Sequence, residues 1–88
     1  MAIELFYTKQ FLKSAKKLPL KQQVKLARLL ETLRNQPFSP ILHTKPLSGP
    51  LTGFYSFRIT RDYRVIFQFI SPRAIKLIDA ANRKEIYR

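Results

Sequence analysis

The stretch GFYSFRITRDYRVIFQFISPRAIKLIDA, residues 53–80, decides the fold. Large apolar side chains alternate with other residues along 53–60 and again along 63–71, and a third apolar segment follows at 74–80. A period of two residues is typical of a β-strand with one face against a core. The stretch therefore predicts three consecutive strands.

Short turn signals separate these strands. Arg61-Asp62 lies between the first two, and Ser71-Pro72-Arg73 lies between the second and third. Turns this short join antiparallel neighbours, so the three strands form a meander. The alternation predicts that Arg58 and Arg64 lie together on the face of the sheet that carries no helices.

The N-terminal part of the chain predicts one more strand and two helices. Residues 2–8 alternate as a strand with both faces at least partly covered, and Thr8 suits the N-cap of a helix at 9–18. Pro19 ends this helix and starts a second one at 20–35, because proline cannot continue the helical hydrogen bonds but tolerates a first turn. The two helices form a hairpin.

Four prolines and a glycine fill 37–50, so no regular element is expected in this long loop. The predicted order is β-α-α-β-β-β. We predict an α+β fold, with a small, mostly antiparallel four-stranded sheet and the N-terminal helical hairpin packed on one face. Residues 1–88 are expected to form a single domain.

The charge of the chain is strongly unbalanced. Its 88 residues contain 17 Lys and Arg against 5 Asp and Glu, a formal net charge of +12. This predicts a polyanionic partner such as nucleic acid or the ribosome, an acidic protein partner, or both. The seven lysines of 1–52 suit long-range attraction, and the six arginines of 53–88 suit bidentate binding of phosphate.

Other features of the composition narrow the class of protein. The chain has no cysteine and one histidine, and no apolar run is long enough for a membrane span. We therefore expect a cytoplasmic protein without disulfides and without a membrane contact. The five carboxylates are scattered and no nucleotide-binding glycine motif is present, so neither a metal-dependent mechanism nor a cofactor is expected.

Cleavage of RNA can proceed without a metal, because the ribose 2′-OH is an internal nucleophile next to the phosphate. Arginine can stabilise the added negative charge but cannot transfer protons. The candidates for proton transfer are Tyr87, Glu85, Lys84 and the loop residue His43.

The stretch LSGPLTGFYSFRITRDYRVIFQFI, together with the ending NRKEIYR, resembles the RelE/ParE superfamily of bacterial type II toxins, and in particular its RelE-like branch. The resemblance covers nearly the whole chain. It implies a ribosome-dependent, metal-independent endoribonuclease, an mRNA interferase that cleaves mRNA in the A site. It also implies a cognate acidic antitoxin as a partner, besides the ribosome and mRNA.

The resemblance also implies roles for individual residues. The predicted catalytic residues are Arg58, Arg64, Arg83 and Tyr87. The residues predicted to contact RNA or the ribosome are Lys9, Lys13, Lys16, Lys17, Lys45, Arg61, Arg73, Asn82 and Lys84.

Two positions depart from the family pattern. Many relatives have a histidine where this chain has Asn82, and some have strand lysines where it has Ser56 and Arg58. Asparagine can position a phosphate or hydroxyl but cannot accept a proton. Two alternatives therefore stay open: a ParE-like inhibitor of DNA gyrase without nuclease activity, and an inactive RNA-binding relative.

Overall fold

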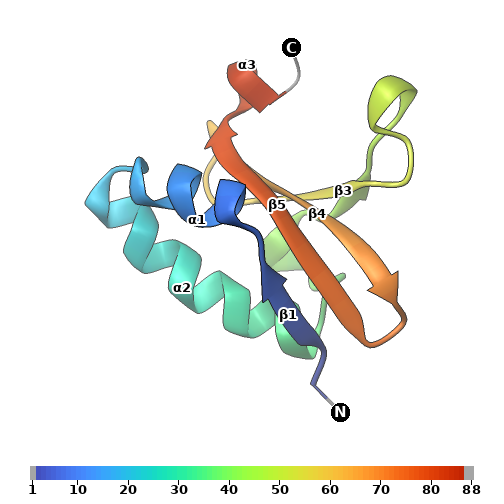
Figure 1. Ribbon diagram of the computed structural model, residues 1–88. Helices are drawn as coiled ribbons and strands as arrows, with labels where there is room; N and C mark the ends of the chain where they lie inside the picture. Colours follow the sequence, from blue (N-terminus) through green and yellow to red (C-terminus); the bar gives the residue numbers. More distant parts are fainter. Residues whose placement is uncertain (1, 87–88) are drawn as a thin grey trace.

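The computed structural model describes residues 2–86 and has the predicted element order, with an additional strand, two 3₁₀ helices and a short C-terminal helix (Figure 1). The longer elements are β1 (Glu4–Tyr7), α1 (Lys9–Lys16), α2 (Leu20–Asn35), β3 (Tyr55–Arg58), β4 (Tyr63–Ser71) and β5 (Ala74–Asn82). The shorter ones are the 3₁₀ helices η1 (Pro40–Leu42) and η2 (Gly49–Leu51), the strand β2 (Lys45–Pro46) and the helix α3 (Arg83–Ile86). The α+β class is confirmed.

The strands form one sheet in the order β1-β5-β4-β3-β2. The predicted meander β3-β4-β5 is antiparallel, and β1 joins it in parallel beside β5, so the sheet is mostly antiparallel as predicted. The predicted count of four strands is wrong, because the loop contributes β2 as a fifth strand at the edge beside β3.

The register places the alternating apolar residues on one face. Tyr55 lies opposite Phe67 and Phe57 opposite Val65, and the side chains of Phe57, Val65 and Phe67 are fully buried. The pairing of β4 with β5 shifts between Ile66 and Phe67 of β4, and β5 has one extra residue at this point. Before this shift the odd-numbered residues of β5 face the core, and after it the even-numbered residues do.

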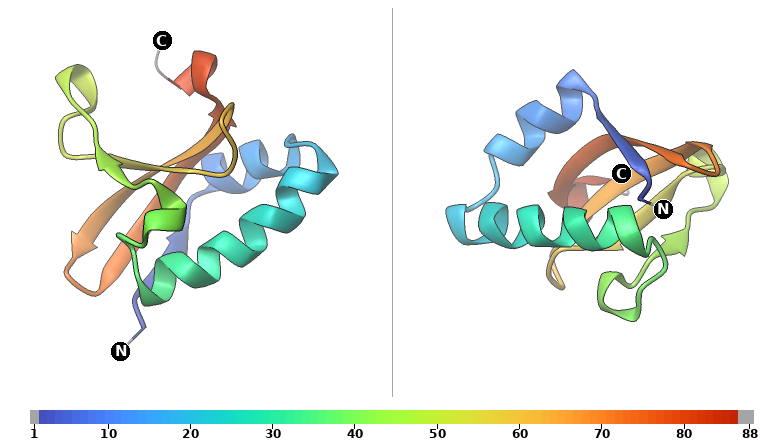
Figure 2. Two further views of the ribbon diagram at one scale, coloured as in Figure 1. Left: turned by 180° about the vertical axis from the view of Figure 1, so that it is seen from behind. Right: turned by 90° about the horizontal axis from the view of Figure 1, so that it is seen from below.

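The helical hairpin covers that apolar face. Figure 2 shows α2 running across one side of the sheet, and Phe11 of α1 and Leu33 of α2 belong to the same buried core as the strands. Thr8 caps α1 as predicted: its Oγ1 accepts a hydrogen bond from the Phe11 N–H at 3.0 Å. The same hydroxyl donates to the carbonyl oxygen of Leu77 at 2.8 Å and so fixes the start of α1 to β5.

Two predictions about the chain outside the core are wrong. In the loop the structure has η1, η2 and β2, because i→i+3 hydrogen bonds and a two-residue bridge to β3 need only short segments and tolerate proline at the first helical position. The strand β1 is not covered on both faces, since Phe6 and Tyr7 are 45% and 48% exposed. It is an edge strand, and α1 and α2 both lie on one side of the sheet.

No helix within residues 2–86 combines the length and the apolar character needed to cross a lipid bilayer.

Candidate functional site

Two arginines lie opposite each other on the open face, which we define as the face of the sheet away from α1 and α2. Arg58 of β3 and Arg64 of β4 are cross-strand partners, next to the pair formed by Ser56 and Ile66. The predicted placement of both arginines on the open face is confirmed.

Both arginines are more buried than a solvated surface pair. Arg64 is only 6% exposed and Arg58 is half-buried. The Nε atoms of both side chains are buried and have no hydrogen-bond partner among the described residues. No carboxylate of residues 2–85 forms an ion pair with either guanidinium; the ion pair on the described surface joins Arg34 and Glu31 of α2.

Within the part of the chain that the structure describes, this arrangement is unfavourable. Like charges directly opposite each other destabilise a sheet, and a guanidinium cannot lose its proton to relieve the burial. An anion with several oxygens would supply the missing acceptors to both side chains at once. The geometry of Arg58 and Arg64 therefore suits a phosphate group.

The C-terminal segment begins next to this pair. Ala81 lies opposite Arg64 and Asn82 opposite Tyr63, and the backbone N–H of Arg83 donates to the carbonyl oxygen of Asp62 at 2.7 Å. Figures 1 and 2 show α3 and the turn around η2 rising on the side of the sheet opposite α2. The start of this C-terminal segment is thus fixed beside the arginine pair.

Three of the candidates for proton transfer lie among the described residues, in two different parts of the chain. Lys84 and Glu85 are exposed on α3, and His43 is exposed in the loop between η1 and β2. Tyr87, predicted to be catalytic, lies outside the described residues.

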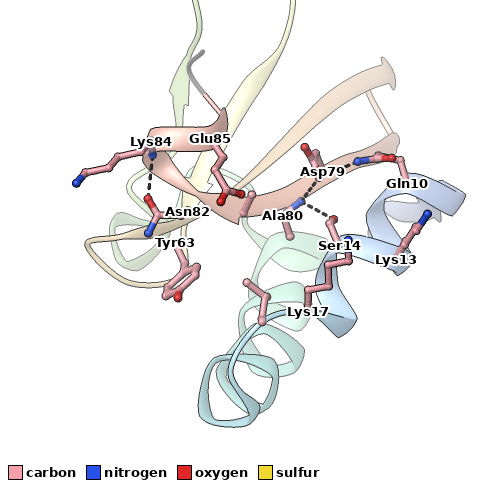
Figure 3. Close-up of a pocket in the computed structure, with 12 residues that line it drawn as sticks. Gln10, Lys13, Ser14, Lys17, Tyr63, Asp79, Ala80, Asn82, Lys84 and Glu85 are labelled. Atoms are coloured by element: carbon pink, nitrogen blue, oxygen red, sulfur yellow. Dashed lines mark hydrogen bonds between the residues drawn. The ribbon is translucent and has the colours of Figure 1, made fainter.

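A groove of about 760 Å³ lies between α1 and the end of β5 with α3 (Figure 3). Four residues predicted to contact RNA line it: Lys13, Lys17, Asn82 and Lys84. The Oδ1 atom of Asn82 accepts a hydrogen bond from the Lys84 N–H at 2.9 Å, which orients the amide. The groove also contains the carboxylates of Asp79 and Glu85, so its charge is mixed.

Other predicted contact residues are distributed around the molecule. Lys9 and Lys16 are exposed on α1, and Lys45 of β2 lies opposite Ser56 at the open face. Arg61 is exposed in the β3–β4 turn near the arginine pair. Arg73 is in the β4–β5 turn at the far end of the nine-residue β4, so the structure does not bring it to the pair.

Several other residues of the groove were not predicted from the sequence. Tyr63, Gln10 and Ser14 line it, and Ser14 Oγ accepts a hydrogen bond from the Ala80 N–H at 2.9 Å. The alternation of β4 assigned Tyr63 only to the core face, and β5 was predicted to end at residue 80 instead of Asn82. A β5 extended to residue 82 would have placed Asn82 beside the start of β4.

Comparisons with known proteins agree with this architecture. No family model matches the chain. Two curated proteins, "Toxin YoeB" of Mycobacterium bovis and "Toxin RelK" of Mycobacterium tuberculosis, are each 34% identical to it over 44 residues, which is 50% of this chain and 52% of theirs. The chain thus spans about half the length of the curated relatives it matches.

Solved structures match over almost the whole chain. YafQ from E. coli superimposes with a TM-score of 0.82 at 18% identity, covering 98% of this chain and 99% of YafQ. The chain therefore has the same fold as YafQ. The RelE-like chain of an archaeal RelE–RelB complex from Pyrococcus horikoshii matches with a TM-score of 0.76 at 25% identity, over 94% and 97% of the two chains. The resemblance noted in the sequence is confirmed.

Proposed function

We propose that this RelE-like chain is the toxin of a bacterial type II toxin–antitoxin system and cleaves mRNA in the ribosomal A site without a metal. The observation that carries the proposal is the buried pair Arg58 and Arg64, whose Nε atoms have no partner among the described residues. A phosphodiester between the two guanidiniums would offset the cost of burying them.

The chemistry follows from the substrate. The ribose 2′-oxygen attacks the adjacent phosphorus, the bond from phosphorus to the 5′-oxygen breaks, and a cyclic phosphate and a 5′-hydroxyl result. The phosphorane gains negative charge during the attack, and Arg58 and Arg64 stabilise it. Arg83, at the start of α3, adds a third positive charge on this side of the molecule.

One proton must leave the 2′-OH and another must reach the 5′-oxygen. Tyr87 stays our prediction for one of these transfers. Lys84 and Glu85 are further candidates, and both are among the residues that the structure describes. Asn82 occupies the position that is histidine in many relatives, and its amide can orient a hydroxyl or phosphate but cannot carry the proton.

Binding to the ribosome is supported by the distribution of charge. Lys9, Lys13, Lys16 and Lys17 are all exposed on or directly after α1. Exposed lysines attract ribosomal RNA over long distances and hold it without base specificity. The site of action would be the cytoplasm, where translating ribosomes carry the substrate.

A cognate antitoxin is the second partner that we propose. Solved structures similar in fold to this chain include toxin–antitoxin complexes: RelE with RelB from P. horikoshii, YafQ with DinJ from E. coli, and YoeB with YefM from Staphylococcus aureus. The net charge of +12 favours an acidic antitoxin.

The test is primer extension on a defined mRNA in a purified translation system, with and without ribosomes. The wild type should cleave within the A-site codon only when ribosomes are present. Arg58→Ala and Arg64→Ala should each reduce the rate at least ~100-fold, because each removes charge stabilisation from the transition state. Arg28→Ala, which removes an exposed arginine from α2, is the matched control and should cleave at the wild-type rate.

The other outcomes separate the alternatives. Absence of cleavage by the wild type, together with loss of DNA supercoiling activity when it is added to gyrase, would support a ParE-like inhibitor. Absence of both effects with retained binding to ribosomes would support an inactive RNA-binding relative. Equal rates for Arg64→Ala and Arg28→Ala would remove the arginine pair from the site.

A further inference from the structure

A row of three side chains crosses the open face beyond the arginine pair. Gln68 of β4 lies opposite Lys76 of β5, and Lys76 in turn lies opposite Phe6 of β1. The three residues are therefore direct neighbours across three adjacent strands, although they are far apart in the sequence.

The burial pattern places the whole row on the open face. In β5 the flanking residues Ile75 and Leu77 are fully buried in the core, so Lys76 points to the other side. In β4 the same holds for Gln68, because Phe67 is fully buried on the core face. Ile3, directly before β1, is buried in the core, and Phe6 of β1 has the opposite parity and is 45% exposed.

The row has the chemistry of a nucleotide site. An exposed aromatic ring on a sheet offers a surface on which a base can stack, and this interaction does not require a particular base. A lysine beside the ring supplies a cation for the flanking phosphate. The Gln68 amide can donate to and accept from a base edge or a 2′-hydroxyl.

The row lies on the same strand face as the arginine pair. Arg64, Ile66 and Gln68 alternate along β4 without a break on that strand. Gln68 is four residue steps beyond Arg64, a distance of about 13 Å along the strand. The arginine pair and the row can therefore engage different nucleotides of one RNA strand that runs along β4.

We propose that Phe6, Lys76 and Gln68 form a second RNA subsite, on which a single-stranded nucleotide outside the cleaved position stacks on Phe6 and places its phosphate at Lys76. This inference rests on the proposed function, because it takes RNA as the ligand of the open face. The subsite gives the mRNA strand a direction along the sheet and a second point of attachment.

A matched control for Phe6 is present on the same strand. Tyr7 is 48% exposed but lies on the opposite face, where its ring contacts Phe11 at a centroid distance of 5.9 Å. Phe6→Leu and Tyr7→Leu each remove one exposed ring from β1 and keep an apolar side chain. Lys76→Gln can be compared with Lys25→Gln, an exposed lysine of α2.

The experiment uses short single-stranded RNA oligonucleotides with a 2′-deoxy substitution at the cleavable position and 2-aminopurine placed at each position in turn. Stacking on Phe6 should quench the fluorescence at one position with the wild type. Phe6→Leu should abolish this quenching and weaken binding about tenfold, whereas Tyr7→Leu should do neither. Lys76→Gln should lower the slope of log K for RNA binding against the logarithm of the salt concentration by about 0.7, as expected when one phosphate is no longer neutralised. Lys25→Gln should leave this slope unchanged.

The failure of this proposal is distinguishable from the failure of the proposed function. Equal quenching with Phe6→Leu and the wild type, or no quenching at any position, would overturn the subsite even if the wild type cleaves ribosome-bound mRNA. Quenching that depends on Phe6 in a protein that does not cleave would support the subsite and reject the nuclease. Binding of a polyglutamate peptide that depends on Phe6 and Lys76, with no binding of RNA, would assign the row to an acidic protein partner and overturn the proposal.

Discussion

Arg58 and Arg64 are direct cross-strand partners, and each buries its Nε atom without a hydrogen-bond acceptor among residues 2–85. A structural pair would have a carboxylate between its members or would point into water. The energetic cost of this pair in the free protein is therefore an argument for a bound anion, and it leads to two measurable consequences.

The first consequence concerns stability. Arg64→Met keeps a long side chain but removes one of two like charges from a site that is 6% exposed. We expect the free energy of unfolding to rise by about 1 kcal/mol, because the repulsion and the burial of an unpaired charge are both relieved. Urea denaturation measures the change, with Arg28→Met on the exposed face of α2 as the control. A loss of stability in Arg64→Met alone would mean that the arginine is held by favourable contacts.

The second consequence concerns anions. Inorganic pyrophosphate should stabilise the wild type by about 1.4 kcal/mol at ten times its dissociation constant, since it binds only the folded protein. The double variant Arg58→Met/Arg64→Met should lose this stabilisation and keep only the general effect of salt. Thermal unfolding at constant ionic strength, with chloride as the reference anion, measures both. Equal stabilisation of the two proteins would place the anion elsewhere.

Much of the fold could be predicted because its signals are local. Pro19 and the apolar spacing of the second helix gave its bounds of 20–35 correctly, and the alternation of 63–71 gave β4. The pairing of two alternating strands across a short turn placed Arg58 and Arg64 on one face. A two-residue strand that contains a proline has no such pattern, so β2 could not be foreseen.

The candidate site was predictable only in part, because burial and assembly depend on contacts between distant segments. Ser56 and Ile66, the cross-strand pair next to the two arginines, are both buried although they lie on the open face. The groove beside α1 is lined by Ser14 and Ala80, which are joined by a hydrogen bond although they are 66 positions apart. No local pattern of the sequence encodes either arrangement.

A third prediction concerns the joint between α1 and β5. Thr8→Ala removes the hydroxyl that accepts from the Phe11 N–H and donates to the Leu77 carbonyl oxygen, so the free energy of unfolding should fall by about 1–2 kcal/mol. Thr8→Ser keeps the hydroxyl and should recover most of the loss. Urea denaturation measures both variants. Equal losses in both would attribute the effect to the methyl group and not to the cap.

The last prediction concerns the lysines of α1. Lys9, Lys13 and Lys16 are exposed on one helix, and none of them forms an ion pair within the described part of the chain. If they face ribosomal RNA, replacing all three by glutamine should weaken binding to 70S ribosomes and lower the salt slope of log K by about 0.9 for each phosphate that is no longer neutralised. The control is Lys21→Gln/Lys25→Gln on α2, which removes exposed charge away from α1 and should keep the wild-type slope. A slope that falls equally per lysine in both variants would show that total charge, and not the surface of α1, determines binding to the ribosome.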